Sequence, residues 1–261
     1  MLALDLPELL YYRELLFFLA WSEIKVRYKQ TIMGVSWAIL QPLFTMILFT
    51  MIFGGFAKIP SEGIPYPVFS YSGLVLWIYF SNSVSQSGVS LVNNSTLISK
   101  VYFPRLLIPT SSCISLLMDY VLALVILVIL MAFYSLLPNV SILLLPLLLA
   151  VTFMLAAGVG YWLSSICVKY RDVRFVLPFF VQLFMFASPV IYPSTFVSEK
   201  YRWLLLLNPM TGLLDAHRAA LLGHKNIDFN GLGISVLVSI IIFITGIIYF
   251  KKTEKDFADL I

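Results

Sequence analysis

Long uncharged stretches, separated by short polar segments, dominate the hydrophobic pattern of the chain. A helix needs about 20 mainly apolar residues to cross the hydrocarbon core of a bilayer. Six stretches approach or exceed that length: residues 34–56, 67–88, 106–137, 142–168, 175–192 and 232–250. The pattern therefore predicts an all-α membrane protein with six transmembrane helices, forming a single transmembrane domain over residues 1–261.

The segment before the first predicted span, residues 5–29, has charged ends and an uncharged middle that finishes at Trp21. This middle is too short to cross a bilayer. We interpret residues 5–29 as an interfacial helix on the cytoplasmic surface, with Asp5 and Glu8 as a pair of helix-start residues. Charged and apolar residues alternate over its last part, however, which would also suit a short strand.

Hydroxyl and amide side chains gather in and just after the second half of the second predicted span. They are Ser81, Asn82, Ser83, Ser85, Gln86, Ser87 and Ser90. Such groups suit contacts between helices or a water-filled cavity better than contact with lipid. This stretch therefore indicates a helix that packs inside the protein or borders a polar space.

Asp119 is the one carboxylate deep within a predicted span. A central Asp costs about 2.5–3.5 kcal/mol on insertion, which the apolar residues around it offset. A proton-coupled carrier usually places several ionisable groups in its spans. We therefore favour a hydrogen-bonded packing role for Asp119 over a role in a proton relay, and the sequence leaves both open.

A long external region, residues 193–230, follows the fifth predicted span. Its apolar runs are too short to cross a bilayer. We predict two short half-buried helices that dip back into the outer leaflet, since irregular backbone is tolerated at that depth when it packs on protein. His217 and His224 lie in this region, and we interpret them as surface or interface histidines rather than metal or proton sites.

Composition and charge support the membrane assignment. Only 11% of the residues are charged, and the mean hydropathy is +0.96, whereas soluble domains carry about 25% charged residues. Most of the 17 Lys and Arg residues fall where the six-span order puts cytoplasmic segments, which predicts two cytoplasmic termini. The net charge of +4 reflects loop cations and indicates no nucleic-acid partner. Cys113 and Cys167 lie in apolar surroundings typical of packed thiols.

The sequence lacks the motifs of an energy-coupling or catalytic protein. It contains no phosphate-binding loop of the Gly-x-x-x-x-Gly-Lys-Ser/Thr type and no Cys/His spacing for a metal. It also lacks the paired acidic groups that a membrane transferase would need. These patterns indicate a pore-forming subunit, not an enzyme, that another protein drives.

Four segments, in this order and spacing, carry a resemblance to a known family: Arg27–Pro42, Asn94–Pro109, Ser188–Pro193 and Asn208–Met210. The chain resembles the permease subunit of ABC-type polysaccharide exporters, which include the O-antigen (Wzm-like), capsule and teichoic-acid permeases. The resemblance implies a homodimer in the bacterial inner membrane, in contact with membrane lipids. It also implies two copies of a separate P-loop ATPase, which bind the ATP and Mg²⁺, so that no cofactor is expected on this chain.

The substrate that this resemblance implies is a lipid-linked polysaccharide, exported from the cytoplasmic side of the membrane. Three alternatives stay open on the sequence alone. Within the same class, the chain would export another lipid or a drug. From other classes, it would be a membrane enzyme of glycan assembly or a passive scramblase.

The resemblance also assigns two functional segments. Residues 93–102 match a coupling helix that docks on the ATPase, and residues 195–222 match short external gate helices. The coupling residues are Asn94, Leu97, Ile98, Lys100 and Tyr102. The gate residues are Asn208, Pro209, Asp215 and Arg218. Because Leu97 and Ile98 are apolar in a polar loop, we expect an exposed tip that inserts into the partner.

Helical periodicity predicts two stripes of side chains that line a glycan conduit. One stripe, on the first predicted span, contains Trp37, Gln41, Phe44 and Leu48. The other, on the fifth, contains Phe175, Phe179, Gln182 and Phe186. The glutamine in each stripe is unfavourable against lipid and suits a cavity or a partner helix. The two stripes would alternatively pack on each other, and we expect the face with Phe180 and Phe184 to matter less for export.

Overall fold

A computed structural model describes the chain except for residues 1–10, 30–33, 138–139, 171, 224–225 and 258–261. Over the described residues the fold is entirely helical, without a strand, which confirms the predicted all-α class. The segment expected to form an interfacial helix is α-helical over Arg13–Lys29, so the alternative of a short strand is wrong. The proposed start at Asp5 and Glu8 lies outside the described residues, as does His224.

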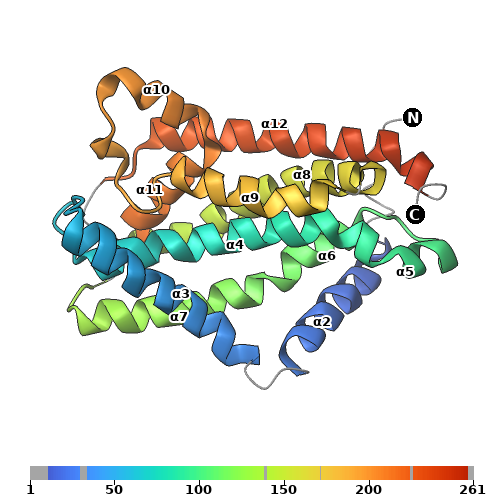
Figure 1. The fold of residues 1–261 in the computed structure, drawn as a ribbon, viewed down its shortest axis with the longest axis horizontal. Coiled ribbons are helices and arrows are strands. Elements are labelled where there is room, and N and C mark those ends of the chain that lie inside the picture. Colours follow the sequence, from blue (N-terminus) through green and yellow to red (C-terminus); the bar gives the residue numbers. More distant parts are fainter. Residues whose placement is uncertain (1–10, 30–33, 138–139, 171, 224–225, 258–261) are drawn as a thin grey trace.

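The α-helices are α2 (Arg13–Lys29), α3 (Gly34–Phe49), α4 (Tyr66–Asn93), α5 (Ser95–Lys100), α6 (Leu107–Ser115), α7 (Leu117–Phe133), α8 (Leu145–Lys169), α9 (Val173–Phe186), α10 (Glu199–Leu207), α11 (Pro209–Leu222) and α12 (Phe229–Thr253). Shorter turns are the π-helix η1 (Thr50–Phe56) and the 3-10 helices η2 (Val140–Leu144), η3 (Ser194–Phe196) and η4 (Glu254–Asp256). Most long helices run along the long axis of the molecule, with α2 and α5 near one end and α10 and α11 near the other (Figure 1).

Within the described ranges, four helical stretches are long and apolar enough to cross a membrane. They are Ser36–Phe56, Leu107–Phe133, Val140–Lys169 and Phe229–Thr253. Helix α9 is a shorter apolar helix of 14 residues. Helix α4 is 28 residues long but less apolar, because serines interrupt it. The count of six spans and the re-entrant external helices stay predictions.

Helix α4 lies at the centre of the bundle and contacts α3, α6, α7, α8, α9 and α11. Most of its serine hydroxyls bond to carbonyls of the same helix, as Ser90 does to the Ser87 carbonyl at 2.7 Å, whereas the Ser83 hydroxyl has no partner among the described residues. Such a bond satisfies a serine without a partner on another helix. The serine-rich half of α4 is therefore compatible with burial, as its composition indicated.

Small residues let α8 approach its neighbours closely. A Cβ atom added at Gly158 would lie 2.7 Å from the Phe243 Cα of α12, and one added at Gly246 would lie 2.4 Å from the Gly158 carbonyl oxygen. On another side, Gly160 packs against Ser87 of α4. Glycine at these positions permits backbone contact between helices, which supplies packing where no hydrophobic effect drives association in lipid.

The third predicted span, 106–137, is not one continuous helix. It divides into α6 and α7 at Leu116, and α7 ends at Phe133. Hydroxyls of α6 bond back to backbone carbonyls one turn earlier, such as Thr110 to Leu106 at 2.7 Å and Ser111 to Ile108 at 2.8 Å. Such bonds compete with the helical ladder and bend helices. Sequence hydropathy does not detect this effect.

The fifth predicted span, 175–192, also ends early, because α9 stops at Phe186 and is followed by turns through Val190. Pro189 lacks a backbone N–H and so cannot continue a helical ladder. Side chains from other helices bond the carbonyls of this irregular segment instead. The hydroxyl of Tyr66 donates to the Ile191 carbonyl at 2.8 Å, and Asn208 donates to the Ala187 carbonyl at 3.2 Å.

Candidate functional site

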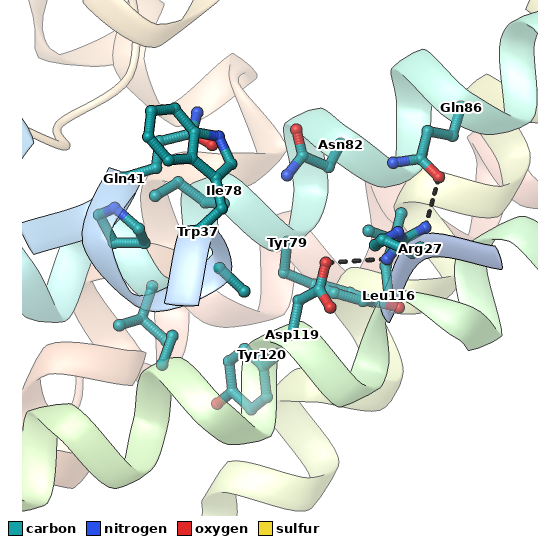
Figure 2. A pocket seen from close by; sticks show the side chains of 14 residues that line it. Arg27, Trp37, Gln41, Ile78, Tyr79, Asn82, Gln86, Leu116, Asp119 and Tyr120 are labelled. Atoms are coloured by element: carbon teal, nitrogen blue, oxygen red, sulfur yellow. Dashed lines mark hydrogen bonds and ion pairs between the residues drawn. The ribbon is translucent and has the colours of Figure 1, made fainter. Parts of the chain in front are cut away.

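A groove with two connected hollows lies along one face of α4, and we call it the α4 groove. The first hollow, of about 450 Å³, lies between α4, α3 and α7, and Arg27 of α2 borders it. The second, of about 340 Å³, lies between α3, α4 and α9. Both hollows are lined by Gln41, Ile78 and Asn82. Figure 2 shows the first hollow, with Trp37 and Gln41 on one side and Asn82 and Gln86 on α4.

The structure brings together the two glutamines that the helical stripes singled out. Gln41 of α3 and Gln182 of α9 both line the second hollow, with Ser81 and Ser85 of α4 between them. The alternative that the two stripes simply pack on each other does not apply to these glutamines. The conduit function of the stripes stays a prediction.

Several amides of the groove are unpaired. In the part of the chain that the structure describes, the side-chain amides of Gln41, Asn82 and Gln182 make no hydrogen bond. Gln41 and Gln182 are exposed and Asn82 is half-buried. These amides are therefore available to water or to a polar molecule in the groove.

The aromatic members of the stripes do not join the glutamines. Trp37 lines the first hollow, but Phe44, Phe175, Phe179 and Phe186 line neither hollow and are more than half exposed. A ring on the outer side of a helix can contact lipid or a second protein surface. Within one chain, the glutamines of the stripes therefore line the groove, whereas most of their aromatic rings lie outside it.

The expected contrast between two faces of α9 needs a correction. Phe184 packs against Trp77 and Phe80 of α4, with ring centroids 5.9 and 6.2 Å apart, whereas Phe180 is 62% exposed. The two residues are one turn apart on α9 but have different surroundings. Helical spacing alone does not show which side of α9 meets α4.

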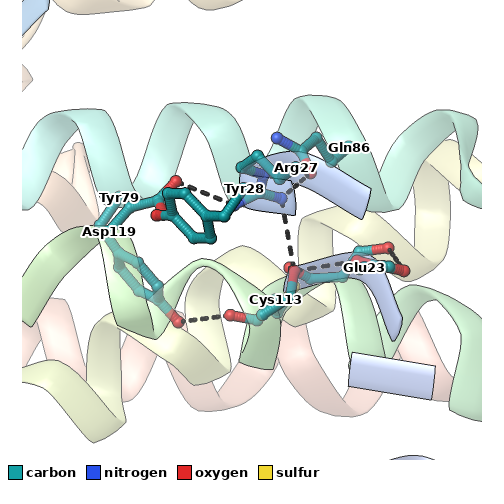
Figure 3. A network of polar contacts seen from close by, with 9 residues as sticks. Glu23, Arg27, Tyr28, Tyr79, Gln86, Cys113 and Asp119 are labelled. Atoms are coloured by element: carbon teal, nitrogen blue, oxygen red, sulfur yellow. Dashed lines mark hydrogen bonds and ion pairs between the residues drawn. The ribbon is translucent and has the colours of Figure 1, made fainter. Parts of the chain in front are cut away.

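At the α2 end of the groove, a polar network joins α2 to α4, α6 and α7 (Figure 3). Arg27 Nη1 donates to Asp119 Oδ2 at 2.8 Å, and Arg27 Nη2 donates to Gln86 Oε1 at 2.7 Å. The hydroxyl of Tyr28 donates to the other oxygen of Asp119. Burial, and then this contact with Asp119, raises the pKa of Tyr28 above its ordinary value, so the phenol stays protonated and able to donate.

A second part of the network fixes the same helix to α6. Glu23 accepts hydrogen bonds from Ser112 at 2.9 Å, from Ser115 at 2.9 Å and from Ser111 at 3.3 Å. Bonds to a charged acceptor are stronger than those between neutral groups. Helix α2 is thus attached through two charged side chains on successive turns, Glu23 and Arg27.

The interpretation of Asp119 as a hydrogen-bonded residue is confirmed, but its partners were missed. Arg27 and Asp119 are 92 residues apart. A lone carboxylate in an apolar span indicates that a polar partner exists, but it does not indicate which residue that partner is.

The segment predicted to couple to an ATPase contains the short helix α5. Asn94 precedes it and donates from Nδ2 to the Ser90 carbonyl at 2.9 Å, so its side chain closes α4 rather than capping α5. Ile98 is only 7% exposed and packs with Phe103 and Phe257 in a second apolar cluster. The expectation of an exposed Ile98 is therefore wrong.

The last three residues of this segment, Lys100, Val101 and Tyr102, are all exposed, and Tyr102 is 90% exposed. They border a surface hollow of about 430 Å³, together with Arg105 and Phe257. Leu97 is half-buried against the same apolar cluster. The apolar surface available to a partner therefore lies after α5, not on it.

The residues assigned to an external gate hold the irregular backbone after α9. Arg218 is buried, stacks 4.0 Å over the ring of Phe69 and donates to the carbonyls of Pro189 and Val190. Asn208 accepts from the Met210 N–H at 2.9 Å, which caps α11, where Pro209 occupies the first position. Asp215 and Arg218 line a small hollow of about 110 Å³ at this end.

His217 of α11 is fully buried, which excludes the surface alternative of the prediction and leaves the interface alternative. Its Nε2 lies 3.1 Å from the hydroxyl of Tyr120 on α7, within hydrogen-bond distance. The described residues contain no group of His, Cys, Asp and Glu side chains suited to a metal ion. His217 is an interface residue between two helices.

The sequence profile of the ABC-2 type transporters matches residues 14–222, which include all of the groove and the polar network. The chain belongs to the ABC-2 transporter family. An O-antigen export system permease of Myxococcus xanthus is 31% identical over 97% of this chain and 98% of its own length. An O-antigen export permease of Klebsiella pneumoniae is 25% identical over 96% of both chains. A polysialic acid transport protein of Escherichia coli is 25% identical over 89% of this chain and 91% of its own length.

These ABC-2 relatives are similar to the chain from end to end. The matched region ends at Leu222, the last residue of α11, so α12 lies beyond the family profile but within the similarity to the individual relatives. Members of this family are transporter subunits of the membrane, which agrees with the apolar helices of the structure.

Proposed function

We propose that this ABC-2 protein is the permease subunit of an ATP-driven exporter that moves a lipid-linked polysaccharide from the cytoplasmic side across the bacterial inner membrane. Two copies of the chain would form the pathway, and two copies of a separate P-loop ATPase would supply the energy. Both termini would be cytoplasmic, with six spans per subunit. The observation that carries this proposal is the similarity, over 97% of the chain, to a relative named as an O-antigen export permease.

The lining of the α4 groove suits a polar cargo. Its unpaired amides, Gln41, Asn82 and Gln182, suit hydroxyl groups, and the ring of Trp37 offers an apolar face to sugar C–H groups. A long polymer must not bind tightly at any one point, so several weak polar contacts in series suit its movement. In the assembled dimer, the exposed rings of Phe175, Phe179 and Phe186 would extend this surface.

The exposed surface after α5 suits contact with a cytoplasmic partner. Tyr102 and Val101 expose apolar area at this surface, and exposed aromatic residues are enriched at protein contacts. An ATPase that bound here would lie close to η4 and to the attachment of α2. Residues of α10 and α11, including Asn208, Pro209, Asp215 and Arg218, would act at the external end.

Co-purification is the direct test of the proposed function. The chain, expressed with a P-loop ATPase encoded beside it, is expected to form a complex with two copies of each subunit. Loss of the chain is expected to leave lipid-linked glycan inside the cell. Failure to hold the ATPase, together with normal glycan export in cells without the chain, would contradict the proposal.

Thiol labelling in intact cells tests the orientation separately. After Cys113 and Cys167 are replaced, single cysteines at Ser61 and Ser198 are expected to react with an impermeant reagent. Cysteines at Ser99 and Lys255 are not. Labelling of the Ser99 variant from outside would contradict the six-span order with cytoplasmic termini.

A further inference from the structure

The first turn of α7 carries two adjacent side chains that bond to two different helices, α2 and α11. Asp119 bonds to Arg27 and Tyr28 of α2, and Tyr120 bonds to His217 of α11. Helix α2 lies towards the end with α5, and α11 lies at the other end (Figure 1). No contact between α2 and α11 is needed for this connection, because neighbouring residues of one helical turn move together.

The Asp119 side of the connection is strong. Its carboxylate accepts from the Arg27 guanidinium at 2.8 Å and from the Tyr28 phenol. The side chains of Arg27 and Asp119 are 25% and 18% exposed. Screening by water is limited at such a site, although not absent. A displacement of the end of α2 would therefore act directly on the first turn of α7.

The Tyr120 side is buried. Tyr120 is 4% exposed and His217 is not exposed at all, so water does not compete for the bond between them. The next residue of α11, Arg218, donates to the carbonyls of Pro189 and Val190. A shift of Tyr120 would thus act on α11 and, through Arg218, on the irregular segment after α9.

The surroundings transmit a displacement of this turn. The turn follows Leu116, the single residue that separates α6 from α7. Asp119 borders the first hollow of the α4 groove, whereas Tyr120 is buried in the core. Because packed interiors transmit strain, a shift of Asp119 is expected to act on Tyr120.

We propose that Asp119 and Tyr120 are positioning residues that link α2 mechanically to α11 through the first turn of α7. The link makes the position of α11 depend on the position of α2. Its use in export, where α2 would lie at the cytoplasmic surface and α11 at the external end, rests on the proposed function. The link itself does not.

Hydrogen exchange of the chain in lipid nanodiscs, without ATPase or glycan, tests the link. Asp119→Asn keeps the shape of the side chain and weakens its bond to Arg27. It is expected to raise exchange about fivefold in α2 and also in residues 209–222 of α11, which Asp119 does not touch. Tyr120→Phe, which removes only the hydroxyl bonded to His217, is expected to raise exchange in α11 and, less strongly, in α2.

Two further variants keep the test decisive. Tyr28→Phe removes one donor to Asp119 from an exposed helix and is expected to give the same pattern at smaller amplitude, which covers the case that Asp119→Asn does not fold. Tyr161→Phe is the matched control, since it removes another buried tyrosine hydroxyl bond, to Thr110 at 2.8 Å, and it should leave α11 unchanged.

An increase confined to α2 in both Asp119→Asn and Tyr28→Phe would overturn the proposal, because the two contacts would then be independent. An equal increase in α11 for Tyr161→Phe would also overturn it, because general loosening would explain the result. Since the sample contains no ATPase, the exchange pattern decides the link even if the proposed function is wrong. In the complex, the linked variants are expected to export less glycan per ATP hydrolysed.

Discussion

Helix α4 is rich in serine and is buried along most of its length, whereas α9 is almost entirely apolar and has one buried residue, Leu177. In a soluble protein the positions of these two helices would be reversed. Here most serine hydroxyls of α4 bond within the helix and its amides border the groove, while α9 exposes aromatic rings. Hydropathy therefore reports which helices tolerate lipid, but it does not report which helices form the core.

The largest loss of stability is expected from a substitution in the buried helix α4. In Gly73→Leu, the new side chain meets the Arg218 guanidinium and the Val190 carbonyl, since even a Cβ atom would lie 2.4 and 3.0 Å from them. Overpacking typically costs about 1–3 kcal/mol, and the displaced Arg218 adds the loss of two hydrogen bonds. Thermal unfolding in detergent is expected to show a marked loss of stability.

Gly233→Leu on α12 is the control for this substitution, because no described atom lies within 4 Å of a Cβ atom added there. It is expected to unfold like the unsubstituted protein. Equal destabilisation by both substitutions would mean that lost helix flexibility, not contact with Arg218, causes the effect.

A similar contrast within the coupling segment is expected to separate folding from partner binding. Ile98→Asp buries a charge in the second apolar cluster and is expected to destabilise the chain by several kcal/mol. Tyr102→Asp changes a side chain that is 90% exposed and is expected to leave unfolding unchanged while weakening ATPase binding at least tenfold. Pull-down and unfolding of the two variants, side by side, check this. Normal ATPase binding by Tyr102→Asp would exclude this surface as the contact.

Within the groove, stability and transport are expected to respond in opposite directions. Asn82→Leu removes an unpaired amide, which should leave stability unchanged or raise it slightly. Loss of one hydrogen bond to a passing sugar, of about 1–1.5 kcal/mol, would reduce export roughly tenfold. Ser85→Ala is the matched control, because the Ser85 hydroxyl already bonds to the Ser81 carbonyl at 2.7 Å. Unchanged export in Asn82→Leu would show that cargo does not use the groove.

The smallest effects on stability are expected on the exposed side of α9. Phe179→Ala with Phe186→Ala removes rings that are 59% and 51% exposed, and it should change unfolding by less than about 1 kcal/mol. If these rings border the conduit, export falls while stability does not. Phe180→Ala, at 62% exposure, is a better control than any pair that includes the packed Phe184. Equal losses of export from the double variant and from Phe180→Ala would place the conduit elsewhere.

The sequence predicted which segments form helices better than it predicted where those helices end. The all-helical class followed from apolar length, and the convergence of Gln41 and Gln182 followed from one polar residue in each apolar stripe. The break at Leu116 and the end of α9 at Phe186 depend on hydroxyl bonds to the backbone and on Arg218, whose effect appears only once α4 and α11 are in place. Local pattern carries no information about such partners.

Contacts between distant residues were likewise beyond the sequence. Asp119 was expected to have a partner, yet nothing in the pattern selected Arg27, 92 residues away, over other cations. Ile98 was expected to be exposed because its neighbours are polar, but Phe257, far along the chain, covers it. In both cases the residue is covered by a segment that lies far away in the sequence, and a local sequence pattern does not identify such a segment.

Phe257 also gives the order of synthesis a consequence. It is fully buried beside Ile98 and lies edge-to-face with Phe250, with ring centroids 5.3 Å apart. The preceding turn is held by Arg105, which donates to the Glu254 carbonyl at 2.6 Å. The ribosome makes Phe257 after every described helix. A product truncated before η4 would therefore keep all the long helices and still leave Ile98 and Phe103 without the ring that packs against them.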